Sequence, residues 1–369
     1  MIEKYNNYCN HYEKDNTATY NTYNEQDYEF GNGHPSPPSF KAFSFYTNYH
    51  FTIIMSILSK VIVILGPTAS GKSGMGIKFA KKYNGEIISC DSRQFYIGMD
   101  VGTAKVKSLK SKVKNIADRK QKIVYSENIA HYMIDIIKPD QDFSVAEFKK
   151  QAEEIINDIL RRKKLPIIVG GTGLYIQAIV DNLSIPEVPP DFKLRKKFEK
   201  IDIEKLWARL IKLDPKSASF VQRQNKRRII RALEVCIKTG KPFSSFQKKG
   251  EPKYNFLQIG IKVDREKLYK RIDKRVDQMI DDGLIREVKK LNKKYSWRLP
   301  AMTGIGYGEF KGKLNKIKDE KVLTEIIQQI KYHTHQYARR QESWFKRDEK
   351  IKWIEKYSEA NKLVKEFLK

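Results

Sequence analysis

The sequence predicts an α/β fold: a P-loop NTPase-like, mostly parallel sheet flanked by helices, with an inserted all-helical lobe. Three observations carry this prediction. A glycine-rich loop lies between a buried strand and a helix at 66–73, and short apolar runs alternate with helical segments as far as residue 181. Residues 191–248 are basic and helical, without a strand signal. The 369 residues suffice for one large domain or two smaller ones.

The first strand, loop and helix form a phosphate-binding motif. The apolar run 61–65 leads into Gly-Pro-Thr-Ala-Ser-Gly-Lys-Ser at 66–73, and a helix follows over 72–82. The two glycines let backbone amides turn inward around an anion, the lysine adds a positive charge, and the last serine can ligate Mg²⁺. We therefore expect a bound diphosphate or polyphosphate. The residues expected to hold it are Gly66, Pro67, Thr68, Ala69, Ser70, Gly71, Lys72 and Ser73, with Ser73 as the metal ligand.

Three more strands and a helix complete the predicted core. The strands are expected over 86–89, 131–136 and 167–169, and the helix over 145–161. Ligands of parallel sheets gather at the carboxyl ends of strands, so the loops 66–73, 90–94 and 170–173 should converge.

Two polar residues follow predicted strands at this edge. Asp91 comes directly after the second strand, where it can act as a general base, although a helix N-cap is an alternative role. Thr172 lies in a glycine run after a later strand, where it can hydrogen-bond beside Asp91 or simply stabilise a turn.

The residue composition changes after Asp181, and prolines at 186, 189 and 190 mark the boundary between the core and the basic helices. A strand pattern returns at 256–263, and long amphipathic helices are expected over 265–293 and 320–347. The predicted division follows these boundaries. It comprises a disordered or wrongly included extension (1–55), the P-loop core (56–185), a helical insert (186–252), a return to the core with C-terminal helices (253–350) and a C-terminal tail (351–369).

Arginine clusters occur on two predicted helices. Arg227, Arg228 and Arg231 share one helical side, a pattern that suits phosphates and bases but also an ordinary solvated face. Arg271 and Arg275 are one turn apart and can reach a diphosphate, or can pair with neighbouring aspartates.

The net charge of +28 is concentrated outside the N-terminal segment. Residues 1–55 hold three lysines against six acids, a net of −3, which leaves +31 for residues 56–369. Such an excess indicates a polyanionic macromolecule such as nucleic acid. An AT-rich genome that favours lysine codons is an alternative that explains part of the lysine but not the arginine clusters.

Other features narrow the class of protein. No stretch of 18 apolar residues and no secretory signal is present, so we expect no membrane association. Three scattered cysteines fit a reducing cytoplasm, and the two histidines at 333 and 335 alone are poor grounds for a metal site. We expect a cytoplasmic monomer.

Several motifs in order resemble the tRNA dimethylallyltransferase family, also called tRNA isopentenyltransferases, of the bacterial type. The likeness spans about residues 57–350. The motifs are Gly66–Ser73, Asp91–Lys105 (DSRQFYIGMDVGTAK), Val169–Tyr175 (VGGTGLY), Arg228–Val235 (RIIRALEV), Ile305–Tyr307 (IGY) and Tyr337–Phe345 (YARRQESWF).

The resemblance implies transfer of a dimethylallyl group from dimethylallyl diphosphate, with Mg²⁺, to N6 of adenosine 37, just 3′ of the anticodon in the tRNA anticodon stem-loop. The acceptors implied are tRNAs that read codons beginning with U. In that scheme Asp91, Thr172 and Lys72 are catalytic, with Asp91 as the base that takes the N6 proton and Lys72 neutralising the diphosphate. The implied tRNA contacts are Asp91, Ser92, Arg93, Gln94, Thr172, Arg195, Arg227, Arg228, Arg231, Thr303, Gly306 and Tyr307.

Some positions depart from the family pattern. Residues 106–130 read as a lysine-rich surface loop, roughly 15 residues longer than usual, a change that costs little in a loop. Gly308 stands where a basic residue is common, which questions that RNA contact, and the zinc finger of some eukaryotic relatives is absent.

Three rival functions use part of the same pattern. They are an adenylate isopentenyltransferase that acts on free AMP or ATP, a P-loop kinase of small metabolites and a non-catalytic RNA-binding ATPase. The arginine-rich insert favours tRNA over a free nucleotide, and the 91–105 motif disfavours a kinase. An ATPase would need an acidic residue where the strand 167–169 ends in glycines.

Overall fold

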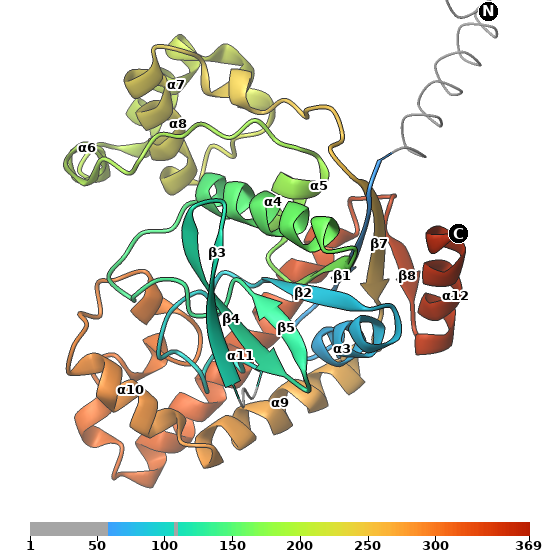
Figure 1. The fold of residues 1–369 in the computed structure, drawn as a ribbon. Helices are drawn as coiled ribbons and strands as arrows, with labels where there is room; N and C mark the ends of the chain where they lie inside the picture. The colour runs from blue at the N-terminus through green and yellow to red at the C-terminus, as the bar shows by residue number, and fades with distance from the viewer. Residues whose placement is uncertain (1–57, 107–109) are drawn as a thin grey trace, which may run out of the picture. The chain divides into compact units, whose positions relative to one another are not determined.

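Strand β1 (Lys60–Leu65), which precedes the P-loop, lies inside a mixed sheet in the computed structural model, which describes residues 58–106 and 110–369 (Figure 1). Within those ranges the sheet has eight strands in the order β3-β4-β5-β2-β6-β1-β7-β8. All neighbours are parallel except β3–β4 and β4–β5. The mostly parallel α/β fold predicted from the sequence is confirmed. The predicted extension at 1–55 lies outside the described residues.

Successive apolar side chains of β1 point to opposite faces of the sheet and pack on both, as expected for a strand buried on both sides. Ile62 and Ile64 enter one core, whereas Val61, Val63 and Leu65 enter the other. The neighbouring strands are β2 (Gly85–Cys90), β5 (Ile129–Tyr132), β6 (Leu165–Gly170) and β7 (Asn255–Ile261).

Helices cover both faces. The core on the Ile62 side is closed by α3 (Lys72–Lys82) and α12 (Tyr357–Leu368). The opposite core is closed by α4 (Val145–Arg161), α5 (Gly173–Val180) and the end of α11 (Glu320–Phe345), which contributes Phe345. A capping box at Ser144 and Glu147 fixes the start of α4.

A separate group of helices packs around a hydrophobic core of its own. It consists of α9 (Arg265–Asp281), α10 (Leu284–Asn292), most of α11 and the short turns η3 (Ala301–Thr303), η4 (Gly308–Phe310) and η5 (Leu314–Lys316). The sequence predicted one helix over 265–293. Instead, Gly283 adopts a φ of +100°, which ends one helix and starts the next.

The inserted segment folds into helices with a core of their own, built around Phe198, Leu210 and Leu233. Its elements are α6 (Phe192–Glu199), α7 (Ile203–Leu213), η1 (Pro215–Ser219), α8 (Lys226–Thr239) and η2 (Phe243–Phe246).

Two segments differ from the sequence interpretation. The expected loop at 106–130 contains a hairpin of β3 (Lys110–Ile116) and β4 (Arg119–Ser126), and the strand expected over 131–136 begins and ends earlier, as β5. Residues 351–369, set apart as a tail, add β8 (Lys352–Ile354) beside β7 and the helix α12. No helix in the described ranges is both long and apolar enough to cross a bilayer.

Candidate active site

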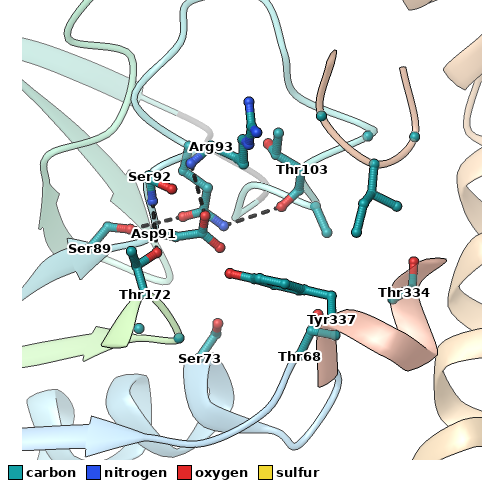
Figure 2. A pocket seen from close by; sticks show the side chains of 18 of the residues that line it. Thr68, Ser73, Ser89, Asp91, Ser92, Arg93, Thr103, Thr172, Thr334 and Tyr337 are labelled. Atoms are coloured by element: carbon teal, nitrogen blue, oxygen red, sulfur yellow. Dashed lines mark hydrogen bonds between the residues drawn. The ribbon is translucent and has the colours of Figure 1, made fainter. Parts of the chain in front are cut away.

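A cavity of about 560 Å³ opens where β1, β2 and β6 end (Figure 2). One side is formed by P-loop residues and the turns after β2 and β6, and the other by α9, α11 and the loop 303–307. The three loops expected to converge therefore do so. Among the expected site residues, those lining the cavity are Thr68, Lys72, Ser73, Asp91, Ser92, Arg93, Gln94, Thr172, Arg275, Thr303, Gly306 and Tyr307.

The P-loop backbone is shaped to receive an anion. Gly66 and Gly71 have φ values of +145° and +98°, and a Cβ on Gly66 would lie 3.1 Å from the Ile261 carbonyl. Gly71 is the N-cap of α3 and offers no side chain, so the first amides of the helix have no side-chain cap. Ligand oxygens can take that place.

Lys72 is partly buried at this cradle, and its Nζ donates a 2.5 Å hydrogen bond to the Pro67 carbonyl. Burial lowers the pKa of Lys72 to about 7, against the opposing charge of Asp91, and Arg275 lowers it further. A bound diphosphate would favour the protonated amine, because an adjacent anion stabilises the charged form.

Gln341 of α11 ties the P-loop to the turn after β6. Its Oε1 accepts from the Thr68 amide and its Nε2 donates to the Gly171 carbonyl, both at 2.8 Å, and its side chain is buried. A Cβ on Gly171 would lie 2.2 Å from Gln341 Nε2, so this approach requires glycine. Gln341 lies within the motif Tyr337–Phe345, but no local sequence pattern predicts its role.

Asp91 lies at the carboxyl end of β2 and lines the cavity. Its Oδ1 accepts a 3.0 Å hydrogen bond from the Arg93 amide, and the residues that follow form turns rather than an α-helix. The alternative role as an α-helix N-cap is therefore wrong, and the carboxylate faces the space that a substrate would occupy (Figure 2).

Thr172 and Tyr337 lie beside Asp91 (Figure 2). The Thr172 hydroxyl accepts from the Ser92 amide at 3.2 Å, which braces the turn after β2 against the turn after β6. Burial and the charge of Asp91 raise the pKa of Tyr337 to about 12, against a hydrogen bond with Thr172. Tyr337 is thus a neutral phenol on the cavity wall, and sequence reasoning had given it no role.

Arg93 and Gln94 are held by contacts within the protein. Arg93 Nη1 donates to the Pro300 carbonyl at 2.7 Å. The Gln94 amide accepts from the Ser89 hydroxyl at 3.0 Å and donates to the Thr103 carbonyl at 3.3 Å. Both residues therefore shape the wall and retain only part of their hydrogen-bonding capacity for a ligand.

The two arginines of α9 separate. Arg275 is partly buried in the cavity wall, where burial lowers its pKa, and its Nη1 lies 3.4 Å from the Thr68 hydroxyl. Arg271 is exposed and does not line the cavity. Of this pair, only Arg275 is placed to meet a ligand of the P-loop.

The arginines of the inserted helical lobe also fall into two groups, one bound to a buried glutamate and one exposed. Arg195 binds Glu234 through both carboxylate oxygens, at 2.8 and 2.7 Å, and Arg231 donates to the same carboxylate at 2.5 Å. The Glu234 side chain is fully buried, and these arginines lower its pKa although burial raises it. Arg227 and Arg228 are exposed on α8, and none of the four lines the cavity.

Residues 94–348 match the sequence model of the IPP transferase family. The chain is 44% identical over 318 residues to the tRNA dimethylallyltransferase of Acetivibrio thermocellus, which covers 84% of this chain and 96% of the relative. Over 314 residues it is 45% identical to the tRNA dimethylallyltransferase of Pelotomaculum thermopropionicum, covering 83% and 94%.

Solved structures are similar as well. The tRNA isopentenylpyrophosphate transferase of Bacillus halodurans is 35% identical with a TM-score of 0.59, covering 84% of this chain and 97% of that one. A eukaryotic dimethylallyltransferase that acts on tRNA is 30% identical with a TM-score of 0.61, covering 78% and 69%. The segment matched by the family model contains Thr172, Arg275 and Gln341, whereas the P-loop and Asp91 precede it.

Proposed function

The chain belongs to the IPP transferase family, and on that premise we propose that it transfers the dimethylallyl group of dimethylallyl diphosphate to N6 of adenosine 37 in tRNA. The acceptors are tRNAs that read codons beginning with U. The enzyme acts as a monomer in the cytoplasm.

The observation that carries this proposal is a single cavity with two different ends. Lys72, Ser73 and Arg275 supply positive charge and a hydroxyl at the P-loop end, and Asp91 supplies a carboxylate next to them. A diphosphate leaving group needs positive charge, and a weakly nucleophilic amine needs a base. Both kinds of residue must lie in one active site so that the donor carbon and the amine can meet.

In the proposed step, the N6 lone pair forms a bond to C1 of the dimethylallyl group while the C1–O bond breaks. The electron pair of that bond leaves with diphosphate, and Asp91 accepts the proton that N6 loses. Lys72, Arg275 and the P-loop amides stabilise the negative charge that develops on the leaving group. The adenine must leave its stack to reach this position, as in other enzymes that act on a base.

Mg²⁺ fits the residues of this end of the cavity. In the described residues no group of three or more His, Cys, Asp or Glu side chains could hold a metal by itself. Ser73 and Asp91 both line the cavity, and Mg²⁺ usually combines one or two protein ligands with phosphate oxygens and water. When bound, the ion would neutralise part of the diphosphate charge.

The helical lobe is the proposed tRNA-binding surface. Arg227 and Arg228 are exposed and offer guanidinium groups to phosphates, while Arg195 and Arg231 reach solvent only in part because they bind Glu234. Near the cavity, Arg93, Thr303, Gly306 and the turn after β2 form the wall for the extruded base.

Mass spectrometry of nucleosides tests the function. Unmodified tRNA transcripts are incubated with the protein, Mg²⁺ and dimethylallyl diphosphate, then digested. The expected product is N6-dimethylallyladenosine from U-reading tRNAs, without modification of parallel samples of AMP or ATP. Prenylation of the free nucleotides with none in tRNA would overturn the proposal.

A further inference from the structure

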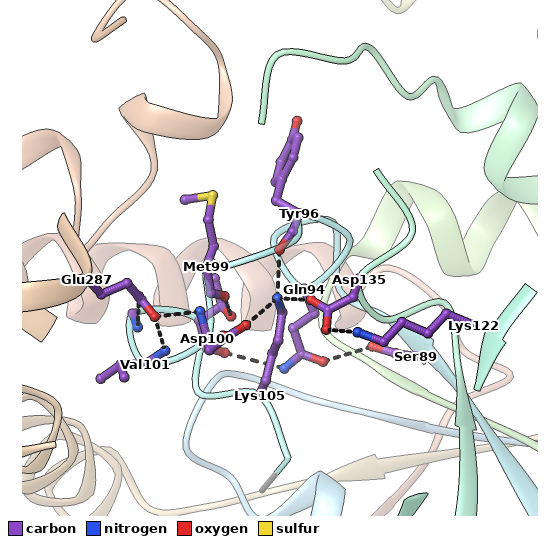
Figure 3. Close-up of polar contacts among 12 residues, drawn as sticks. Ser89, Gln94, Tyr96, Met99, Asp100, Val101, Lys105, Lys122, Asp135 and Glu287 are labelled. Carbon is purple, nitrogen blue, oxygen red and sulfur yellow. Dashed lines mark hydrogen bonds and ion pairs between the residues drawn. The ribbon is translucent and has the colours of Figure 1, made fainter. Parts of the chain in front are cut away.

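Glu287 lies on α10, outside the cavity, and its carboxylate accepts four hydrogen bonds. Figure 3 shows those from Asp100 and Val101. Oε2 accepts from the amides of Asp100 and Val101, each at 2.8 Å. Oε1 accepts from the Gly102 amide at 3.1 Å and from the Tyr307 hydroxyl at 2.7 Å. Three successive amides on one carboxylate fix a backbone in a single conformation.

These contacts join two segments that both line the cavity, 102–104 and 303–307. A Cβ on Gly102 would lie 2.5 Å from the Tyr307 ring, so the two segments pack with no room for a side chain. Tyr307 is itself buried, and burial together with the charge of Glu287 holds its pKa far above the usual range. The phenol therefore remains a donor to Glu287.

Lys105 makes further contacts that hold the same segment. Lys105 donates to the Tyr96 carbonyl at 2.6 Å and to the carboxylates of Asp100 and Asp135 at 2.8 and 2.5 Å (Figure 3). Gln94 holds the Thr103 carbonyl between these anchors. Removal of Glu287 would therefore release the amides of 100–102 and the Tyr307 hydroxyl, while Lys105 still holds Asp100 and Gln94 still holds Thr103.

The segment lies on the acceptor side of the cavity. Figure 2 shows Thr103 across the cavity from Thr68 and Ser73, which belong to the P-loop. A change in this wall should alter how an extruded base is held and leave the diphosphate cradle as it is.

We propose that Glu287 is a positioning residue, which sets the acceptor wall by holding residues 100–102 and Tyr307 together. The kinetic test of this proposal rests on the proposed prenyl-transfer function. The contacts of Glu287 are observed in the structure whatever the function is.

Glu287→Gln is the sharpest variant, because it keeps the shape and replaces one oxygen by an NH₂ group. In either orientation that NH₂ faces at least one backbone N–H donor and leaves it unpaired. We expect the KM for tRNA to rise or kcat/KM for tRNA to fall about 5- to 50-fold, with the KM for dimethylallyl diphosphate within about twofold of wild type. Glu366→Gln, an exposed glutamate on α12, is the matched control for charge.

Tyr307→Phe removes only the phenol and should give a smaller effect of the same kind. Combined with Glu287→Gln, it should add less than its own single effect, because both act on one contact. If Glu287→Gln does not fold, the tRNA and donor KM values of Tyr307→Phe decide.

Hydrogen exchange gives a readout that does not need activity. Amides 100–102 should exchange at least about tenfold faster in Glu287→Gln, while amides of β1 keep their protection. Unchanged exchange at 100–102, or equal rises in both KM values, would overturn the proposal. If the wild-type protein modifies only free nucleotides, the proposed tRNA function is refuted. The KM for that nucleotide would then be compared with the KM for dimethylallyl diphosphate to test the role of Glu287.

Discussion

The backbone amide of Thr68 donates to the side-chain oxygen of Gln341, although 273 residues separate them along the chain. The P-loop is therefore held from outside its own strand and helix. Because Gln341 also donates to the Gly171 carbonyl, it links the P-loop to the turn that carries Thr172. One side chain of α11 thus joins two of the loops that border the cavity.

Gln341→Leu should loosen this link. The Thr68 amide and the Gly171 carbonyl would lose their partners, which costs about 1–3 kcal/mol of folding free energy. We expect a lower Tm and a KM for dimethylallyl diphosphate raised about tenfold. Gln328→Leu, at an exposed position of the same helix, should change neither. A donor KM equal to that of wild type would show that the P-loop holds its shape without Gln341.

Asp91→Asn should abolish most turnover because an amide cannot accept the N6 proton. The expected loss in single-turnover rate is about 10²- to 10⁴-fold, while tRNA affinity stays within about threefold. Asp140→Asn, an exposed aspartate, serves as the control. Near-normal turnover of Asp91→Asn would mean that another group takes the proton.

Lys72 should make donor binding depend on pH. Its pKa in the free protein is lowered to about 7, so the amine is charged below pH 7 and loses its charge as the pH rises. Diphosphate binds the charged form better, so affinity should fall from pH 6 to pH 8, and binding at pH 7.5 should take up a proton. Calorimetry in buffers of different ionisation enthalpy measures that uptake.

Lys72→Arg is the control, since a guanidinium stays protonated throughout this range. Its binding should lack the proton uptake of the wild type, and Lys72→Ala should raise the donor KM at every pH. Equal uptake by wild type and Lys72→Arg would assign the proton to another group.

The lobe arginines should separate into two classes. Arg227→Ala with Arg228→Ala should weaken tRNA binding and reduce the slope of log K against log salt by about 0.7–0.9 for each lost phosphate contact. Folding should be unaffected because both side chains are exposed. A filter-binding salt titration measures the slope, and a slope equal to that of wild type would remove these residues from the interface.

Arg231→Ala should instead destabilise the lobe. It removes one partner of the buried Glu234 and leaves that carboxylate to Arg195 and the Asp191 amide. We expect a measurable fall in Tm together with any loss of binding. A changed salt slope at constant Tm would indicate that Arg231 acts mainly on RNA.

Local patterns predicted the parts of the site that are contiguous in sequence. The 66–73 motif and the strand before it predicted the cradle, because the same few residues both form the turn and bind the ligand. Asp91 was found because the carboxyl ends of parallel strands meet. Gln341, Tyr337 and Glu287 could not be assigned roles in this way, since helical periodicity does not say which polar residue of α10 or α11 faces a distant loop.

The misreading of residues 106–130 has a local cause. The β3–β4 hairpin turns at Ala117 and Asp118, both with positive φ, and neither is the glycine that usually marks such a turn. Lysines on the exposed edge strand β3 conceal the alternation that would predict a strand. In the lobe, helical spacing grouped Arg231 with Arg227 and Arg228 but could not show that a buried glutamate three residues later binds it.

The position of β1 in the sheet also bears on synthesis of the protein. This strand pairs with β6 and β7, which begin about a hundred and about two hundred residues later in the chain. The P-loop that follows β1 is held by Gln341 of α11. A growing chain thus presents the phosphate motif long before the partners that hold it. Such long-range pairing folds slowly. Nascent protein should acquire affinity for diphosphate only after most of the chain has left the ribosome, although the motif itself emerges early.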